Sequence, residues 1–180
     1  MPRRCGEPML EALIFVVFPF CMLFAAISDM LSMTIANRVP LLLIAVFAFV
    51  APLTGMDWAT FGMHFAAGAM VLCVTFALFA IGGMGGGDAK LLAATSVWMG
   101  LGFPLLQYLV VSTFLGGMLT LAIIAYRNSP LSAFTLGNRF FRNFASDTKG
   151  IPYGIALGAG GLLIFPDSPL MVWALERLAS

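Results

Sequence analysis

The sequence predicts an all-α fold, a polytopic membrane protein with about six transmembrane helices. Hydrophobic residues make up 61% of the chain and charged residues only 9%, whereas about 25% of the residues of a typical soluble protein are charged. Long apolar runs alternate with short polar or glycine-rich connections along the chain. We therefore expect residues 1–180 to form a single integral membrane domain.

The expected helices are six apolar segments, at about 9–27, 39–53, 58–81, 89–101, 105–126 and 152–165. The second is short for a bilayer that takes roughly 20 helical residues to cross. Its helix could begin earlier, near Ser32, which would place Asp29 just inside the membrane interface. The hydrophilic loop 127–150 alternates phenylalanines with polar residues, a pattern that fits a helix on the membrane surface and an irregular loop equally well.

The distribution of basic residues predicts the orientation of the chain. Six spans place the connections 28–38, 82–90 and 127–150 on one side of the membrane. That side carries six basic residues and the other side three, respectively Arg38, Lys90, Arg127, Arg139, Arg142 and Lys149, and Arg3, Arg4 and Arg177. An excess of basic residues marks the cytoplasmic side. Asp29 and Asp88 are therefore expected at the same, cytoplasmic, membrane face.

Charge and cysteine usage argue against several other classes of protein. The net charge is +1 and the basic residues are dispersed, so no nucleic-acid partner is expected. Cys5, Cys21 and Cys73 form no CxxC pair, which argues against a zinc site or a disulfide framework. His64 is the single histidine and is interpreted as a satisfied or interfacial residue. No cofactor or metal is expected.

The most informative stretch is a glycine-rich loop that leads into an acidic residue. Five of the six residues in 82–87 are glycine, Asp88 follows them, and Lys90 comes two residues later. An Asp at the bilayer centre costs on the order of 3 kcal/mol, so an ionisable residue tied to a membrane segment indicates function. Glycines permit an unwound backbone and the close approach of a second chain. This combination suits a site that receives an extended peptide.

Three motifs resemble the prepilin peptidase family, the GxGD intramembrane aspartyl proteases that process type IV pilin-like precursors. The segment 85–94, GGGDAKLLAA, is similar to the family's GxGD signature. Asp29, followed by Ile35-Ala36-Asn37, resembles the family's other aspartate ahead of its isoleucine-proline-asparagine stretch. Residues 151–154, IPYG, resemble the opening of the family's last helix. The chain departs from the pattern at Ala36, where proline is usual, and in the absence of basic residues from 30–34.

The resemblance implies catalytic roles for two residues and substrate-binding roles for four. The catalytic pair is Asp29 and Asp88, and the substrate-binding residues are Gly85, Gly86, Gly87 and Lys90. This short single-domain chain is most similar to the peptidases of Tad/Flp-type pilus systems. That similarity implies a short pilin precursor as substrate, cleaved at the end of its leader. It further implies a multi-pass protein of the bacterial inner membrane with its active site facing the cytoplasm. Membrane lipid and the pilus-assembly machinery are the other partners expected.

The same comparison bears on domain organisation and on Lys90. Larger members carry an N-terminal cytoplasmic domain with paired cysteines that is associated with methylation, and no such cysteine pair occurs here, so we expect no methyltransferase domain. Lys90 lies two positions from Asp88 and so does not share its helix face. It could bind an acidic group of the substrate or a lipid phosphate, or it could anchor the helix end.

Two carboxyl groups that share one proton can hydrolyse a peptide bond without a metal or a covalent intermediate. Asp88 begins an expected helix, whose positive N-terminal end favours an ionised carboxylate, so we assign it as the base-like partner of a pair that titrates as a unit. Two alternatives stay open. One is a GxGD peptidase for another class of precursor, and the other is a small cation- or proton-coupled transporter that uses the same two aspartates.

Overall fold

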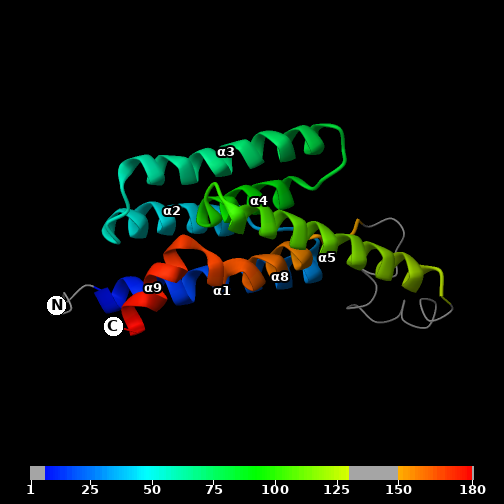
Figure 1. Ribbon diagram of the computed structural model, residues 1–180. Helices are drawn as coiled ribbons and strands as arrows, with labels where there is room; N and C mark the ends of the chain where they lie inside the picture. Colours follow the sequence, from blue (N-terminus) through cyan, green and yellow to red (C-terminus); the bar gives the residue numbers. More distant parts are fainter. Residues whose placement is uncertain (1–6, 130–149, 180) are drawn as a thin grey trace.

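The computed structural model describes residues 7–129 and 150–179 as a bundle of seven α-helices with one short 3₁₀ turn (Figure 1). The elements are α1 (Glu7–Ser32), α2 (Arg38–Leu53), α3 (Trp58–Ala80), α4 (Gly86–Met99), α5 (Phe103–Arg127), α8 (Gly154–Ile164), the 3₁₀ turn Phe165–Asp167 and α9 (Pro169–Ala179). The all-α expectation is confirmed for the described residues. The loop expected at 127–150 lies largely outside them.

Helices α1 to α5 run in alternate directions between the two ends of the bundle, and α8 runs back toward the end where α1 begins, with α9 continuing it after a bend of 46° (Figure 1). The connections 33–37 and 81–85 and the start of α8 consequently lie toward the same end. This arrangement brings the C-terminal end of α1 and the N-terminal end of α4 together, although Asp29 and Asp88 are far apart in the sequence.

Helix α4 forms the centre of the bundle. Every residue from Leu91 to Met99 is buried, and the helix packs on α2, α3 and α8. Because this helix is covered by protein on all sides, it can be short and still satisfy its backbone hydrogen bonds away from lipid. Its position fixes where Asp88, in its first turn, lies relative to the other helices.

Aromatic packing around Trp98, near the C-terminal end of α4, holds together the half of the bundle that lies away from Asp88. The Trp98 indole Nε1 donates a hydrogen bond to the Leu43 carbonyl oxygen at 3.0 Å, so its polar atom is satisfied within the apolar interior. The Phe18 ring centroid lies 5.1 Å from that of Trp98 and 4.2 Å from that of Phe165. These contacts join α1, α2 and α4 to the 3₁₀ turn that follows α8.

His64 is a structural residue in this core. Its side chain is buried, and its Nδ1 lies 2.7 Å from the Val97 carbonyl oxygen. The interpretation of His64 as a satisfied residue is confirmed. No group of three or more metal-ligating side chains occurs in residues 7–129 and 150–179.

The glycines of α8 allow it to lie directly against α1. A Cβ atom at Gly158 would stand 2.9 Å from the Met22 carbonyl oxygen, and one at Gly154 would stand 2.9 Å from the Asp29 Cβ. The GxxxG spacing of these two glycines therefore marks a close helix contact, as small residues do in membrane interfaces. Of the neighbouring pair in α5, Gly116 packs against the Tyr153 ring, whereas Gly117 has no atom near its hypothetical Cβ.

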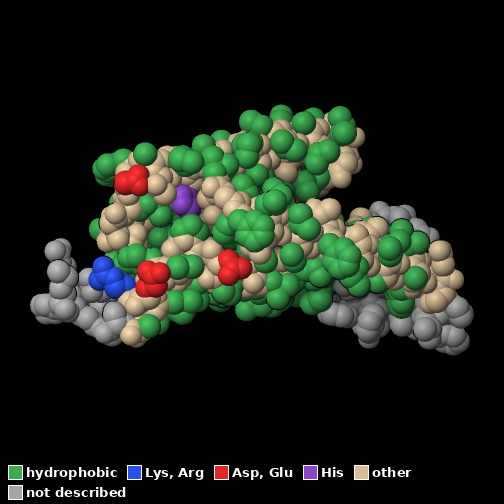
Figure 2. All heavy atoms as spheres, viewed as in Figure 1, with side chains coloured by type: hydrophobic (Ala, Val, Ile, Leu, Met, Phe, Trp, Pro, Cys, Tyr) green, Lys and Arg blue, Asp and Glu red, His purple; other side chains and the backbone are tan. Residues whose placement is uncertain are grey.

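Helix length does not show all six expected membrane spans. Among the described residues three helices, α1, α3 and α5, are long and apolar enough to cross a bilayer, and a fourth span is possible if α8 and α9, bent by 46°, are counted together. Helix α2 has 16 residues and α4 has 14, about 24 and 21 Å at 1.5 Å per residue, against a hydrocarbon core of about 30 Å. Figure 2 shows a mostly hydrophobic surface on the face in view, as expected for a helical membrane protein.

We predict that Gly158→Ala destabilises the protein and that Gly117→Ala does not. The added methyl group at residue 158 must displace the backbone of α1, and overpacking of this kind costs about 1–3 kcal/mol. Residue 117 has open space around it. Thermal unfolding of the two purified variants in detergent measures the difference. Equal unfolding midpoints would show that α1 and α8 are not held as closely as described.

Candidate active site

Asp29 lies in the last turn of α1, close to where a left-handed residue ends the helix. Met33 has φ 56°, and its N–H donates to the Asp29 carbonyl oxygen at 2.8 Å. A left-handed conformation is uncommon for a residue other than glycine. The Ser28 hydroxyl donates to the Thr34 carbonyl oxygen at 2.9 Å, which holds the chain in place after the turn, and the Ser32 hydroxyl donates to the Ser28 carbonyl oxygen at 2.7 Å.

The structure corrects the expected end of the first helix. The expected second segment, 39–53, matches α2, which begins at Arg38, whereas the alternative start near Ser32 is wrong, because α1 itself continues to Ser32. The two serines that resemble a polar interruption are helical: the Ser28 hydroxyl bonds to the following loop at Thr34, and the Ser32 hydroxyl bonds back to Ser28 within the helix. Asp29 is therefore held rigidly by a long helix, with its side chain only 5% exposed.

Asp88 is positioned by glycines that leave room for it. Gly85 is the N-cap of α4, and a Cβ atom there would stand 2.7 Å from Asp88 Oδ2. A Cβ atom at Gly87 would stand 3.2 Å from the Ile35 Cβ. The absence of a side chain at these two glycines therefore matters more than their flexibility. It leaves room for the Asp88 carboxyl group beside Gly85 and for the loop that follows α1 beside Gly87.

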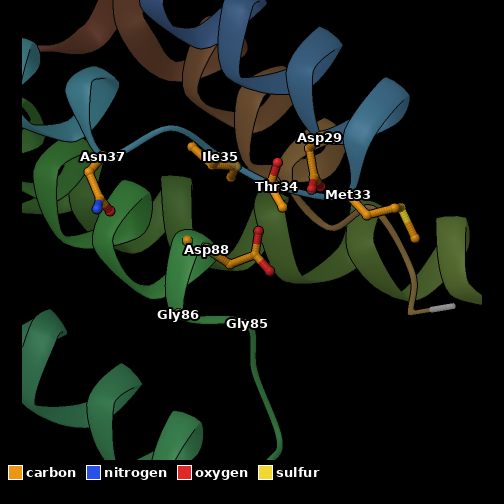
Figure 3. A pocket seen from close by; sticks show the side chains of 9 residues that line it. Asp29, Met33, Thr34, Ile35, Asn37, Gly85, Gly86 and Asp88 are labelled. Atoms are coloured by element: carbon orange, nitrogen blue, oxygen red, sulfur yellow. The ribbon is translucent and has the colours of Figure 1, made fainter.

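The two aspartates meet at an open pocket of about 290 Å³. Figure 3 shows both carboxyl groups turned toward the space between the end of α1 and the start of α4. The pocket is lined by Asp29, Met33, Thr34, Ile35, Asn37, Gly85, Gly86, Gly87 and Asp88. Five of the six predicted site residues thus lie together, and Lys90 is the exception.

Asp29 has a partner that sequence reasoning missed. The Gly154 N–H donates to Asp29 Oδ2 at 2.7 Å, in a buried hydrogen bond between the first and last parts of the bundle. This bond favours the ionised carboxylate, whereas the burial of the Asp29 side chain favours the neutral form. The resemblance of segment 151–154 to the opening of the family's last helix was the one feature of the sequence that could have pointed to this contact. Its physical role is to bring a free N–H without a side chain against Asp29.

The Asp88 carboxyl lies outside the three long spans, and its surroundings favour the neutral form. Burial, and next to it the charge of Asp29, raise the pKa of Asp88 to about 7. Asp88 Oδ1 is buried and has no hydrogen-bond partner among the described residues. A helix N-terminus contributes only about 0.3–1 kcal/mol, less than about one pKa unit. Burial therefore acts against the effect of the helix end, on which the assignment of Asp88 as the base-like partner was based.

Lys90 contacts the rim of the pocket rather than its interior. Its Nζ donates to the Asn37 Oδ1 at 3.0 Å, and Asn37 lines the pocket. The bond joins the first turn of α4 to the residue that precedes α2. Lys90 is thus placed to fix the loop that faces the aspartates.

A helical membrane protein whose pocket receives two carboxyl groups has the character of an aspartic-type membrane peptidase. The comparison with protein families makes this specific. The model of the type IV leader peptidase family matches residues 16–125, more than half of the chain, and the chain belongs to that family. It is accordingly a prepilin peptidase of the aspartic type. Neither the curated proteins nor the solved structures contain a match to the chain.

We predict that Asp88 titrates near pH 7 and that Asp29→Asn lowers its pKa. The substitution removes the charge of Asp29 but not the burial, so the pKa of Asp88 should fall while staying above its ordinary value of 3.8. The infrared band of the protonated carboxyl, identified by its loss in Asp88→Asn, follows this titration. It should persist at pH 6 and disappear above pH 8. Its disappearance near pH 4 in the unsubstituted protein would contradict the prediction.

Proposed function

We propose that this peptidase removes the leader from type IV or Flp-type pilin precursors at the cytoplasmic membrane face, with Asp29 and Asp88 as its catalytic pair. The observation that carries the proposal is the convergence of both carboxyl groups, from the ends of two different helices, on one open pocket. Family membership supports prepilins as the substrate class. The same membership favours a peptidase over a transporter.

The contacts of the two aspartates support a division of roles. Both carboxyl groups are buried, but Asp29 has a hydrogen bond from Gly154 that favours its ionised form, so we assign it as the base, and Asp88, whose pKa is raised to about 7 by burial and by the charge of Asp29, as the neutral acid. Asp29 takes a proton from water as the water oxygen adds to the scissile carbonyl carbon, while Asp88 protonates the carbonyl oxygen. The C–N bond then breaks: the leaving nitrogen takes the proton from Asp29, and the proton on the former carbonyl oxygen returns to Asp88. The products are a new carboxyl terminus and a new amino terminus.

The surroundings of the pair suit an extended peptide. Gly82 has a left-handed backbone (φ 77°), and no atom lies near its hypothetical Cβ, so the loop before α4 leaves space beside the pocket. Gly85, Gly86 and Gly87 line the pocket without side chains. A precursor segment unwound from its helix can therefore bring its backbone close to both carboxyl groups.

The alternating helix directions support a six-pass protein with the aspartates at one membrane face. In this arrangement α2 and α4 are short crossing segments within the protein interior, and the connections next to Asp29 and Asp88 face the cytoplasm, where Arg38 and Lys90 also lie. A newly made precursor presents its leader on this side. Membrane lipid surrounds the apolar outer faces of α3 and α5, and the pilus-assembly machinery receives the product.

We predict that Asp29→Asn and Asp88→Asn each abolish leader removal, because an amide cannot carry the shared proton. Cleavage should fall by at least about 10²–10⁴-fold, the usual contribution of a general acid or base. The assay is the gel shift of a co-expressed pilin precursor. Asp57→Asn is the matched control, since Asp57 is an N-cap in the turn before α3 and asparagine caps equally well. Persistent cleavage in either variant, at equal abundance in the membrane, would reject the pair.

For Lys90 we predict a positioning effect that passes through Asn37. Lys90→Gln and Asn37→Ala should each slow cleavage by about 2- to 10-fold, corresponding to a hydrogen bond of about 0.5–1.5 kcal/mol. The double variant should be no slower than either single variant. Arg38→Gln, a substitution of an exposed neighbouring cation, is the control. A further loss from Lys90→Gln in the Asn37→Ala background would instead assign Lys90 to the substrate or to lipid phosphate.

A further inference from the structure

Met33 has a backbone conformation that disfavours its own side chain. Its φ of 56° lies in the left-handed region, where a Cβ atom crowds the following carbonyl oxygen and where glycine or asparagine is preferred. Hydrogen bonds hold the conformation on both sides. The Met33 N–H donates to the Asp29 carbonyl oxygen at 2.8 Å. On the other side, the Ser28 hydroxyl donates to the Thr34 carbonyl oxygen at 2.9 Å. The backbone at residue 33 would therefore accommodate glycine more easily than methionine.

The hydrophobic core gives no reason for a methionine at this position. Met33 is half-buried, but among the described residues the half-buried apolar side chains that pack on the core do not include it. Ile35, two residues later, is buried and lies against Gly87 and Gly154. The loop after α1 is thus anchored to the interior through Ile35, whereas the Met33 side chain is left for a different contact.

That side chain borders the open pocket of the two aspartates. Met33 and Ile35 are the apolar side chains of the pocket lining, and Ile35 is already packed against the interior. In the view of Figure 3, Met33 lies on one side of the two carboxyl groups and Asn37 on the other. Methionine is unbranched and adapts to apolar partners of different shape. Strained backbone that persists beside a pocket of this kind points to a functional contact.

We propose that Met33 is a specificity-determining residue that contacts a large apolar side chain of the substrate next to the scissile bond. Met33 can act in this way only if the pocket cleaves a peptide, so the proposal rests on the proposed function. A peptide that crosses the two carboxyl groups meets a polar side chain at Asn37 and an apolar one at Met33. Burial of apolar surface at Met33 strengthens binding of the substrate and leaves the chemistry to the aspartates.

Thermal unfolding in detergent separates this contact from a structural role of Met33. Glycine and asparagine both suit the left-handed conformation, so Met33→Gly and Met33→Asn should leave the unfolding midpoint unchanged or raise it. A lower midpoint in both variants would overturn the proposal, because it would show that the methionine side chain supports the fold.

The kinetics of cleavage test the apolar contact itself. Two precursors are compared, one with leucine on both sides of the cleaved bond and one with alanine. For the leucine precursor, Met33→Gly and Met33→Asn should raise KM by about 10-fold, through the loss of one apolar contact, with little change in kcat. For the alanine precursor KM should change by less than about 2-fold, because the partner of Met33 is already missing. An equal rise for both precursors would overturn the proposal and assign Met33 to the shape of the loop.

Ile81→Asn is the matched control for contact with lipid. Ile81 lies in the connection before α4, at the same end of the bundle, and is 80% exposed, but it does not line the pocket. This variant should leave KM unchanged for both precursors. A rise in KM as large as that of Met33→Asn would assign both residues to the membrane surface and overturn the proposal.

Binding to the inactive Asp88→Asn protein gives a readout that needs no cleavage. A fluorescent peptide carrying the leucine cleavage site should bind about 10-fold more weakly when Met33→Gly is added, whereas the alanine peptide should bind the two forms alike. If the unsubstituted protein cleaves no precursor but this difference is found, the proposed function fails and the apolar contact at Met33 stands. If the precursors are cleaved and the difference is absent, the role of Met33 is overturned and the proposed function stands.

Discussion

The hydrogen bond from the Gly154 N–H to Asp29 Oδ2 is the contact on which the site depends. It joins residues 125 positions apart and forms only because Gly154 has no side chain to separate α8 from α1. The same close approach continues at Gly158, which packs against Met22 of α1, and Gly160 packs against Ser112 of α5. Placement of one carboxylate and closure of the bundle are thus parts of a single packing arrangement.

The sequence was sufficient for the fold class and for the grouping of the aspartates. Apolar segments of helical length predict an all-α membrane protein, and their alternation puts Asp29 and Asp88 at one end of the bundle. The glycine run before Asp88 correctly indicated the pocket lining, because a backbone without side chains is a local property. These inferences depend on composition and on the number of segments, which short-range patterns report well.

What could not be predicted depends on contacts between distant segments. The bond to Gly154, and the bond from Lys90 to Asn37, become visible only when three helices are placed in space. The end of α1 was misjudged because Met33 adopts a left-handed conformation that gives no glycine signal, and because two serines that look like an interruption lie within the helix. The burial of Asp88 could not be predicted, because a helix end is visible in the sequence, whereas burial by neighbouring helices is not.

The sequence distance across the Asp29–Gly154 bond has a consequence for biosynthesis. A chain leaving the ribosome inserts α1 and α4, and with them both aspartates, before residue 154 has been made. Asp29 then lacks its backbone donor, and the face of α4 that α8 covers is open. The nascent chain therefore carries both acids before the backbone contact that holds Asp29 can form.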